Sequence, residues 1–181
     1  VEYTVTREEG EDVDEYTITA AGKEKQGNYK VSYETGIFTI NPKTVVVTIT
    51  ENSGKADYDG EEHEVTGYKF EADTELYTEE DFTFSGNAKV TGTNAGTYEM
   101  ALTADDFENT NENFTNVTFN IVDGTLVIAP KAVTVKADAK SKTYGDEDPE
   151  LTATVTGTLN GDTVEYTVTR EEGEDVDEYT I

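Results

Sequence analysis

The sequence predicts an all-β protein made of tandem small modules. Three observations lead to this prediction: Tyr, Phe, Val and Thr are frequent, apolar and polar residues alternate over short stretches, and the chain repeats itself. Those residue types suit the half-buried surface of a pleated sheet. Alternation with a period of two is the pattern of a strand that buries one face. We therefore expect short strands arranged as a β-sandwich or a related small β fold.

The repeat is most evident at the ends of the chain. The stretch VEYTVTREEGEDVDEYTI occupies residues 1–18 and again residues 164–181 without a change, an offset of 163 residues. A weaker similarity relates residues 43–60 to 131–146, and residues 27–43 to 112–131. Internal similarity at a fixed spacing is the mark of a repeat protein. The 163-residue period therefore contains two modules, which we call type A and type B.

The Pro-Lys pairs at Pro42 and Pro130 predict the module boundaries. Residues 43–130 form a complete type B module, residues 1–42 the C-terminal half of a type A module, and residues 131–181 the N-terminal half of the next one. We expect the chain to be a window on a longer continuous fibre. The alternative is that half-modules of successive chains complete each other.

Alternation also predicts which side chains point inward, and the turns lie between the alternating stretches. Turn signals include Asp59-Gly60, Asp123-Gly124 and Asn160-Gly161. One helical turn is expected within residues 103–111. The inward sets are Val45, Val47 and Ile49; Val133, Val135 and Ala137; Tyr98, Met100 and Leu102; Val117, Phe119 and Ile121; Leu126 and Ile128; Leu151, Ala153 and Val155; Val164, Tyr166 and Val168; Tyr16 and Ile18; Tyr29, Val31 and Tyr33; and Phe38 and Ile40.

The charge of the chain restricts its partners. Forty acidic residues against 13 Lys and Arg give a net charge of −27. Nucleic acid and anionic membrane surfaces are poor partners for such a chain, because phosphate groups are bound mainly by Lys and Arg. The sequence has no cysteine and no apolar run that could span a membrane, so we expect neither disulfides nor membrane insertion. The composition favours an extracellular location.

Proline at each boundary predicts stiff junctions. Its fixed φ angle and the absence of a flexible spacer limit bending between a module and the next. We expect a rod-like array whose partners are neighbouring repeats of the same chain.

Catalysis is not expected. The chain has one histidine, His63, expected as an exposed turn residue, and no cysteine, so the commonest catalytic base and one nucleophile are scarce or absent. We assign no catalytic, cofactor-binding or metal-ligating residue. The acidic runs at 8–15, 171–178, 78–81 and 146–150 are expected as solvated turns. Ca²⁺ binding is the alternative for them, although none has the spacing of an EF-hand loop.

Two further kinds of site have candidate residues in the sequence. A Lys–Asn cross-link would need a buried Lys, Asn and acid, for which Lys136, Asn120 and Glu99 are the candidates, and we do not expect it. The Tyr and Phe residues are expected in the core because they follow the strand alternation. Loops 71–81 and 104–111 of type B, absent from type A, are the expected place for any ligand surface.

Several motifs resemble the MBG repeat of the YGX type. They are Lys142, Tyr144-Gly145-Asp146, Asp148-Pro149, Asn160-Gly161-Asp162, Arg170-Glu171, Gly173-Glu174-Asp175, Tyr179 and Asn28-Tyr29. Residues 55–68 and 81–98 of type B are similar to companion repeats of the YDG type.

The resemblance implies immunoglobulin-like modules or, alternatively, β-grasp-like ones, in a repetitive surface protein of bacteria attached to the cell wall. It implies a structural stalk or fibre segment of an adhesin that spaces a binding region from the cell. The alternative is a module that binds a host glycan or surface protein through type B loops, with avidity from repetition.

Overall fold

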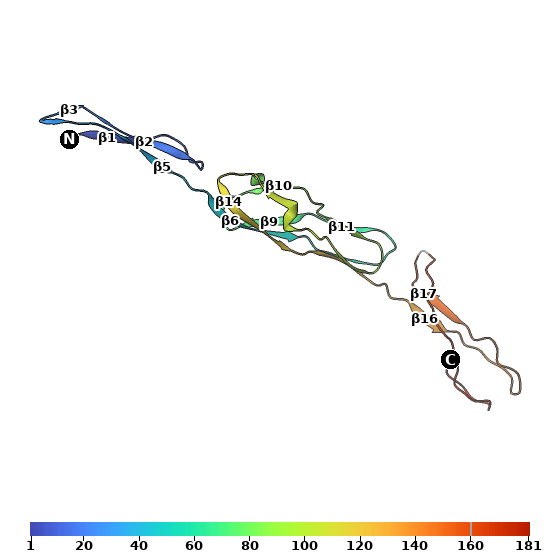
Figure 1. Cartoon of the computed structure of the whole chain (residues 1–181). Helices are drawn as coiled ribbons and strands as arrows, with labels where there is room; N and C mark the ends of the chain where they lie inside the picture. The colour runs from blue at the N-terminus through green and yellow to red at the C-terminus, as the bar shows by residue number, and fades with distance from the viewer. Residues whose placement is uncertain (160) are drawn as a thin grey trace. The chain divides into compact units, whose positions relative to one another are not determined.

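The structure is a computed structural model that describes residues 1–159 and 161–181; Asn160 of the predicted Asn160-Gly161 turn lies outside them. The chain is all-β, as predicted. Its described strands form two- and three-stranded sheets without a closed barrel (Figure 1). The chain divides into two compact units. Unit 1 holds residues 1–51, 67–88 and 101–123, and unit 2 holds residues 52–66, 89–100 and 124–181.

Unit 1 begins with an antiparallel three-stranded sheet, drawn in blue in Figure 1. Its order is β1-β2-β5, with β1 at Tyr3–Arg7, β2 at Glu15–Gly22 and β5 at Thr35–Thr39. A small hairpin of β3 (Lys25–Gln26) and β4 (Tyr29–Lys30) lies between β2 and β5 in the chain. Every residue of β1 and β5 is exposed.

The rest of unit 1 is built around one long strand. β6 (Lys43–Glu51) lies between β14 (Phe114–Val122), to which it is parallel, and β9 (Tyr68–Ala72), to which it is antiparallel. Val45, Val47 and Ile49 are fully buried, which confirms the inward face predicted for this stretch. β10 (Phe82–Phe84) pairs with β13 (Phe107–Asn109) as a separate antiparallel ribbon.

Aromatic rings form a large cluster in the core of unit 1. Neighbouring ring centroids are between 4.9 and 6.3 Å apart, in edge-to-face, tilted and stacked arrangements. The expectation that aromatics pack in the core is confirmed for this cluster. Its members are Tyr68, Phe70, Tyr77, Phe82, Phe84, Phe107, Phe114 and Phe119.

Two 3₁₀ turns lead into the β10–β13 ribbon. η2 (Ala104–Asp106) confirms the helical turn predicted within residues 103–111, and η1 (Glu79–Asp81) was not predicted. Both follow the pattern Thr-x-x-Asp-Phe, and in both the aspartate accepts hydrogen bonds from the backbone and hydroxyl of the threonine. The phenylalanine that follows each turn is buried.

Unit 2 contains a three-stranded sheet and two ribbons. The sheet has the order β12-β15-β7, with β12 at Gly96–Glu99, β15 at Thr125–Ala129 and β7 at Gly54–Asp57, and β15 runs parallel to β7. Leu126 and Ile128 of β15 are buried, as predicted. One ribbon pairs β8 (His63–Thr66) with β11 (Lys89–Gly92), and the other pairs β16 (Thr134–Ala137) with β17 (Ala153–Thr156).

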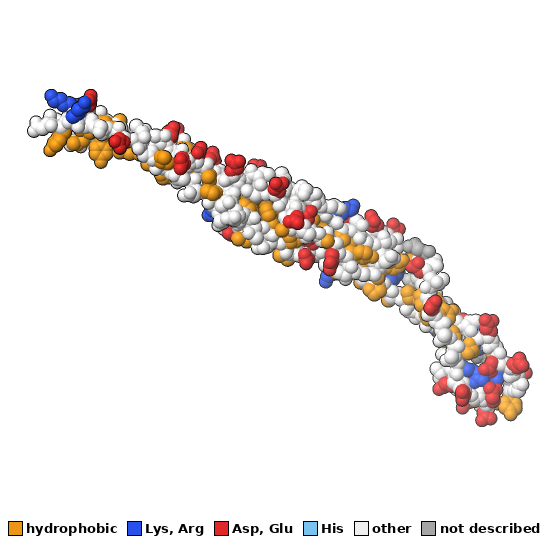
Figure 2. All heavy atoms as spheres, in the orientation of Figure 1, with side chains coloured by type: hydrophobic (Ala, Val, Ile, Leu, Met, Phe, Trp, Pro, Cys, Tyr) orange, Lys and Arg blue, Asp and Glu red, His pale blue; other side chains and the backbone are white. Residues whose placement is uncertain are grey.

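The inward prediction is wrong for part of the type A sequence. Residues 164–168 do not form a strand. The predicted inward residues that are exposed rather than buried are Tyr29, Phe38, Val133, Val135, Val164 and Tyr166. Alternation shows that a segment has an apolar face, but burial needs a second element to cover that face. Figure 2 shows exposed hydrophobic side chains (orange) and acidic side chains (red) on both type A halves, residues 1–42 and 131–181. Within the described residues, no helix has the length and apolar character needed to cross a membrane.

Candidate functional site

A tyrosine closes each of three similar turns. The hydroxyl groups of Tyr16, Tyr98 and Tyr179 donate to the carbonyl oxygen four residues earlier, at 2.8, 2.9 and 3.1 Å. This hydrogen bond supports the alignment of Tyr98 with Tyr16 made from the sequence. It ties the tyrosine to the loop that precedes it, as the tyrosine corner does in immunoglobulin-like sandwiches.

A glycine lies six residues before each of these tyrosines. A Cβ atom at Gly10 or Gly173 would be 2.1 Å from the tyrosine ring, and one at Gly92 would be 2.4 Å from it. The ring therefore lies directly over the glycine backbone, where no side chain fits. The Gly-x₅-Tyr spacing was missed in the sequence analysis. It occurs there four times, and the fourth pair, Gly27 and Tyr33, does not bring the ring over the glycine.

In the duplicated stretch, an arginine completes the turn. One guanidinium nitrogen of Arg170 donates to the carbonyl oxygens of Glu171 and Gly173, at 2.7 and 2.9 Å. Its guanidinium carbon lies 5.5 Å from the centroid of the Tyr179 ring, a cation–π distance. Arg7 does the same in the first copy, with Glu8, Gly10 and Tyr16.

The two copies share one further contact of a glutamate. Glu171 accepts a hydrogen bond from the N–H of Thr180 at 2.7 Å, and Glu8 accepts one from the N–H of Thr17 at 2.6 Å. These backbone donors hold the pKa of both glutamates below the usual value, since they stabilise the charged form. The turn within the eighteen residues therefore keeps the same hydrogen bonds in both copies, whereas residues 3–7 and 15–18 form strands and the identical residues 166–170 and 178–181 do not.

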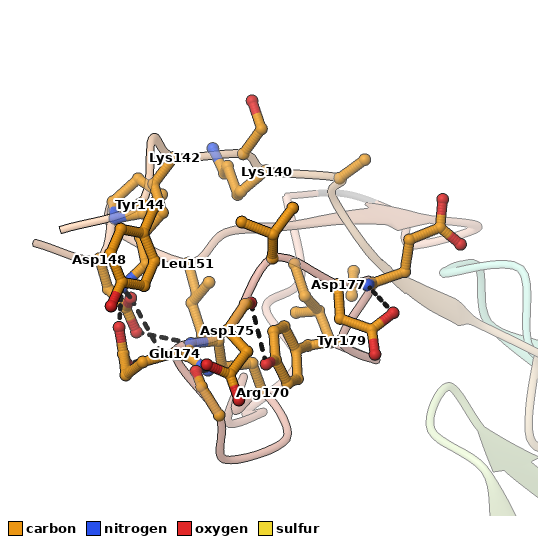
Figure 3. Close-up of a pocket in the computed structure, with 18 of the residues that line it drawn as sticks. Lys140, Lys142, Tyr144, Asp148, Leu151, Arg170, Glu174, Asp175, Asp177 and Tyr179 are labelled. Atoms are coloured by element: carbon orange, nitrogen blue, oxygen red, sulfur yellow. Dashed lines mark hydrogen bonds and ion pairs between the residues drawn. The ribbon is translucent and has the colours of Figure 1, made fainter. Parts of the chain in front are cut away.

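The C-terminal copy has an additional set of charges, shown in Figure 3. Asp148 accepts two hydrogen bonds from Arg170, at 2.6 and 3.0 Å, and one ion pair from Lys142 at 2.7 Å. Glu174 accepts from the same two cations, at 2.8 Å from Arg170 and 2.6 Å from Lys142. Two cations and two carboxylates therefore alternate in a closed set, which we call the charge clamp.

The charge clamp changes the proton affinity of its members. Hydrogen bonds from Arg170 and then Lys142 lower the pKa of Asp148 to about 2. Lys142 and Arg170 likewise lower the pKa of Glu174, and Asp148 and Glu174 raise the pKa of Lys142. All four groups are therefore charged at neutral pH, and none is poised to exchange a proton there. This chemistry suits a structural tie rather than acid–base catalysis.

The clamp borders a cavity of about 700 Å³. Its lining comes from within segments 137–151 and 170–181, with Leu151, Val176 and Ile181 among the apolar members. Its rim carries the aromatic ring of Tyr144, which is 71% exposed.

Comparison with known protein families gives a match for the type A halves and for the type B module. Residues 44–130 match the MBG domain, and residues 1–39 and 133–181 match the MBG domain of the YGX type. The chain belongs to the MBG domain family. Neither a curated protein nor a solved structure matches the chain. MBG domains occur in adhesin-like repeat proteins of the cell surface, which gives the chain a general role as an adhesin repeat.

The first MBG junction is closed by a single amide side chain. Asn113 Oδ1 accepts a hydrogen bond from the N–H of Val13 at 2.7 Å, and its Nδ2 donates to Asp12 Oδ1 at 2.8 Å. The carbonyl oxygen of Asn113 also accepts from the N–H of Lys43 at 3.0 Å. Asn113 thus joins the acidic loop of residues 1–42 to the start of β6 and the loop before β14.

The second junction uses a tyrosine. Tyr58 donates its hydroxyl hydrogen to Asp162 Oδ2 at 2.8 Å, and its N–H donates to the carbonyl oxygen of Ala129 at 2.9 Å. The bond to Asp162 raises the pKa of Tyr58, because it stabilises the protonated phenol. Tyr58, Pro130, Lys131 and Asp162 line one cavity beside this contact.

The residues singled out for chemistry are not assembled into a site. His63 was expected in an exposed turn, but it begins β8 with 25% of its side chain exposed, and its Nε2 lies 3.0 Å from Asp59 Oδ1. Lys136, Asn120 and Glu99, the candidates for a cross-link, are each exposed. Among the described residues, no three His, Cys, Asp or Glu side chains are grouped to hold a metal ion.

The two loops expected to bind a ligand hold each other instead. Tyr77 is 2% exposed, and its hydroxyl donates to Asn109 Oδ1 at 3.0 Å. Asn111 Nδ2 donates to Asp81 Oδ1 at 2.6 Å, and the N–H of Thr110 donates to the carbonyl oxygen of Asp81 at 2.8 Å. Burial raises the pKa of Tyr77 to about 12. Segments 71–81 and 104–111 are therefore part of the core scaffold of the type B module.

Proposed function

We propose that this chain is a structural segment of a stalk on the surface of a bacterial cell, in which MBG modules space a binding region away from the cell. It acts there without catalysis, outside the cell and attached through the rest of its protein to the wall, and its partners are neighbouring repeats. The observation that carries the proposal is the junction at Asn113, where one amide ties a module to the loop of the preceding half-module.

Such a junction resists bending for two reasons. Only residues 40–42 separate β5 from β6, and Pro42 fixes one of the φ angles among them. Tilting residues 1–42 away from the next module must also break the bonds of Asn113 to Asp12 and Val13 together. The high negative charge adds repulsion between neighbouring stalks, which keeps them apart.

Among the described residues, the contacts of the type B loops do not favour ligand binding. The polar groups of segments 71–81 and 104–111 named above are used for hydrogen bonds between the segments. Removing either segment would therefore break the module rather than a peripheral loop.

Small-angle X-ray scattering tests the proposal. We expect one narrow distribution of interatomic distances for the chain, and a broader one after insertion of six Gly and Ser residues between Asn41 and Pro42. Equal distributions for both proteins would refute a stiff junction. Saturable binding of the chain to a glycan array would contradict a purely structural role.

A further inference from the structure

The strands that begin and end the type B module are held by parallel pairing. We propose that this pairing makes the module load-bearing, so that it resists extension when the chain is pulled along its length. The proposal deepens the proposed stalk and rests on it for the direction of the load, because tension along a stalk enters the module at Pro42 and leaves it at Pro130. The resistance itself follows from the pairing.

In unit 1, the first strand of the module is paired with β14. The pairing is parallel and runs from Lys43 opposite Phe114 to Thr50 opposite Val122. The two strands lie side by side in Figure 1. The register is interrupted once, by a bulge in β14. The strand that the stalk would pull first is therefore bonded over almost its whole length.

In unit 2, the last strand of the module is paired in the same way. β15 runs parallel to β7, from Leu126 opposite Gly54 to Ala129 opposite Asp57. The separation in sequence between partners is the same as at the end of the pairing in unit 1. The same two stretches of the chain therefore provide the parallel pairing in each unit.

We call these two stretches, residues 43–57 and 114–129, the terminal segments. Tension pulls the first segment toward its N-terminus and the second toward its C-terminus. Because paired strands of the two segments are parallel, these directions are opposite, and the segments must slide past each other before the chain can lengthen. Sliding loads the evenly spaced bonds of a parallel ladder together, which is loading in shear. Pulling the same strands apart from one end would break the bonds one after another.

A further backbone hydrogen bond closes the pairing at each end. The N–H of Lys43, directly after the first boundary proline, donates to the carbonyl oxygen of Asn113 at 3.0 Å. The carbonyl oxygen of Ala129, directly before the second boundary proline, accepts from the N–H of Tyr58 at 2.9 Å. Tension at either proline therefore meets a bonded residue at once, with no free stretch from which peeling could start.

Hydrophobic packing protects the paired strands from water. The side chains of Val45, Val47 and Ile49 on β6 are fully buried, and those of Leu126 and Ile128 on β15 are buried as well. Hydrogen bonds are stronger where the local dielectric is low. Water also cannot replace a bond that it does not reach. Burial of these strands therefore raises the unfolding barrier, which governs how a protein yields to force.

Single-molecule force spectroscopy of the full 181-residue chain tests the proposal. The sequence has no cysteine, so two introduced cysteines define the direction of the force. Asn41→Cys combined with Lys131→Cys loads the terminal segments in shear. Asn41→Cys combined with Glu112→Cys pulls β6 and β14 apart from one end and is the matched control. All three positions are exposed, so the same fold is pulled in two directions.

We expect the shear pair to unfold in one step, at a force about twofold or more above that of the control pair. The length of the step identifies the module, since each released residue adds about 3.5 Å. Equal forces in the two directions, or gradual lengthening of the shear pair without a step, would overturn the proposal.

Failure of this proposal is distinguishable from failure of the stalk. Force spectroscopy measures the type B module between its two attachment points, whereas scattering measures the stiffness of the junctions. A broad distance distribution in scattering would refute the stiff junction and leave a direction-dependent force unexplained by anything but the pairing. A narrow distribution with equal forces would leave the stalk and refute the load-bearing role.

Discussion

At the scale of single residues, the glycines beneath the tyrosine rings show how closely the turns are built. Gly92 lies on β11, and an added Cβ atom would be 2.4 Å from the Tyr98 ring. Gly96 lies on the neighbouring strand β12, where the same atom would be 3.7 Å from the ring, an ordinary contact. Two glycines next to one ring therefore differ in whether a methyl group fits.

Gly92→Ala should lower the free energy of unfolding by about 1–3 kcal/mol, because the ring or the backbone must move to admit the methyl group. Gly96→Ala is the matched control and should change it by less than about 1 kcal/mol in either direction. Urea unfolding of both variants, followed by tyrosine fluorescence, makes the comparison. Equal losses would show that the ring does not lie over Gly92.

Asp148 determines how the charge clamp responds to acid. Its pKa falls from the ordinary 3.8 to about 2 in the folded protein. A carboxylate whose pKa is lower in the folded state stabilises that state fully above its unfolded value. The contribution declines as pH falls from about 3.8 toward 2 and is absent below both values.

Asp148→Asn should therefore destabilise residues 131–181 at pH 6, and the difference from wild type should shrink as pH falls through this window. The stability difference between the variant and the wild type is measured at each pH, by hydrogen exchange at Gly173 and Thr180 or by thermal melting. Glu172→Gln, an exposed change in the same loop, is the charge-matched control. A difference that stays constant from pH 6 to pH 2 would contradict the lowered pKa.

At the scale of elements, the two Thr-x-x-Asp turns are alike in form but differ in what surrounds them. Asp81 and Asp106 each accept from the N–H and hydroxyl of the threonine three residues before. Asp81 also accepts from Asn111 Nδ2 at 2.6 Å. Both aspartates therefore cap their own turn, but only Asp81 of η1 also links segment 71–81 to segment 104–111.

Asp81→Ala should cost more stability than Asp106→Ala. Loss of the cap costs about 1 kcal/mol in either turn, and loss of the Asn111 bond costs about 1 kcal/mol more at Asp81 because the amide is left unpaired. Asp106→Ala serves as the control within the same module. Chemical denaturation measures the free energy of unfolding of both variants. Equal losses of stability would show that the bond between Asp81 and Asn111 contributes nothing.

These elements also show how far the sequence could be used for prediction. Period-two alternation identified the buried face of β6 at Val45, Val47 and Ile49, and the apolar residues Leu126 and Ile128 of β15. It could not place Phe38 or Tyr166, since their burial depends on a covering element rather than on their own strand. The charge clamp was missed because Asp148 and Arg170 are 22 residues apart, and nothing local to either one indicates the pair.

At the scale of the whole molecule, a tandem array transmits orientation only as well as its junctions do. The junction before β6 depends on the side-chain amide of Asn113. Its oxygen accepts a hydrogen bond from the N–H of Val13, and its nitrogen donates one to the carboxylate of Asp12. An amide is suited to this position because it is both donor and acceptor, and an aspartate there would face the carboxylate of Asp12.

Asn113→Ala should free residues 1–42 to move against the module that follows, without unfolding either part. The measurement is ¹⁵N relaxation: we expect one rotational correlation time for residues 15–22 and 43–51 in the wild type and a shorter one for residues 15–22 in the variant. Asn120→Ala, an exposed change on β14, is the control and should leave both values unchanged.

Asn113→Asp should act like the alanine variant at neutral pH because two carboxylates then oppose each other. If the correlation times of the Asn113→Ala variant match those of the wild type, the amide does not hold the junction, and Pro42 with its short linker must account for any stiffness on its own.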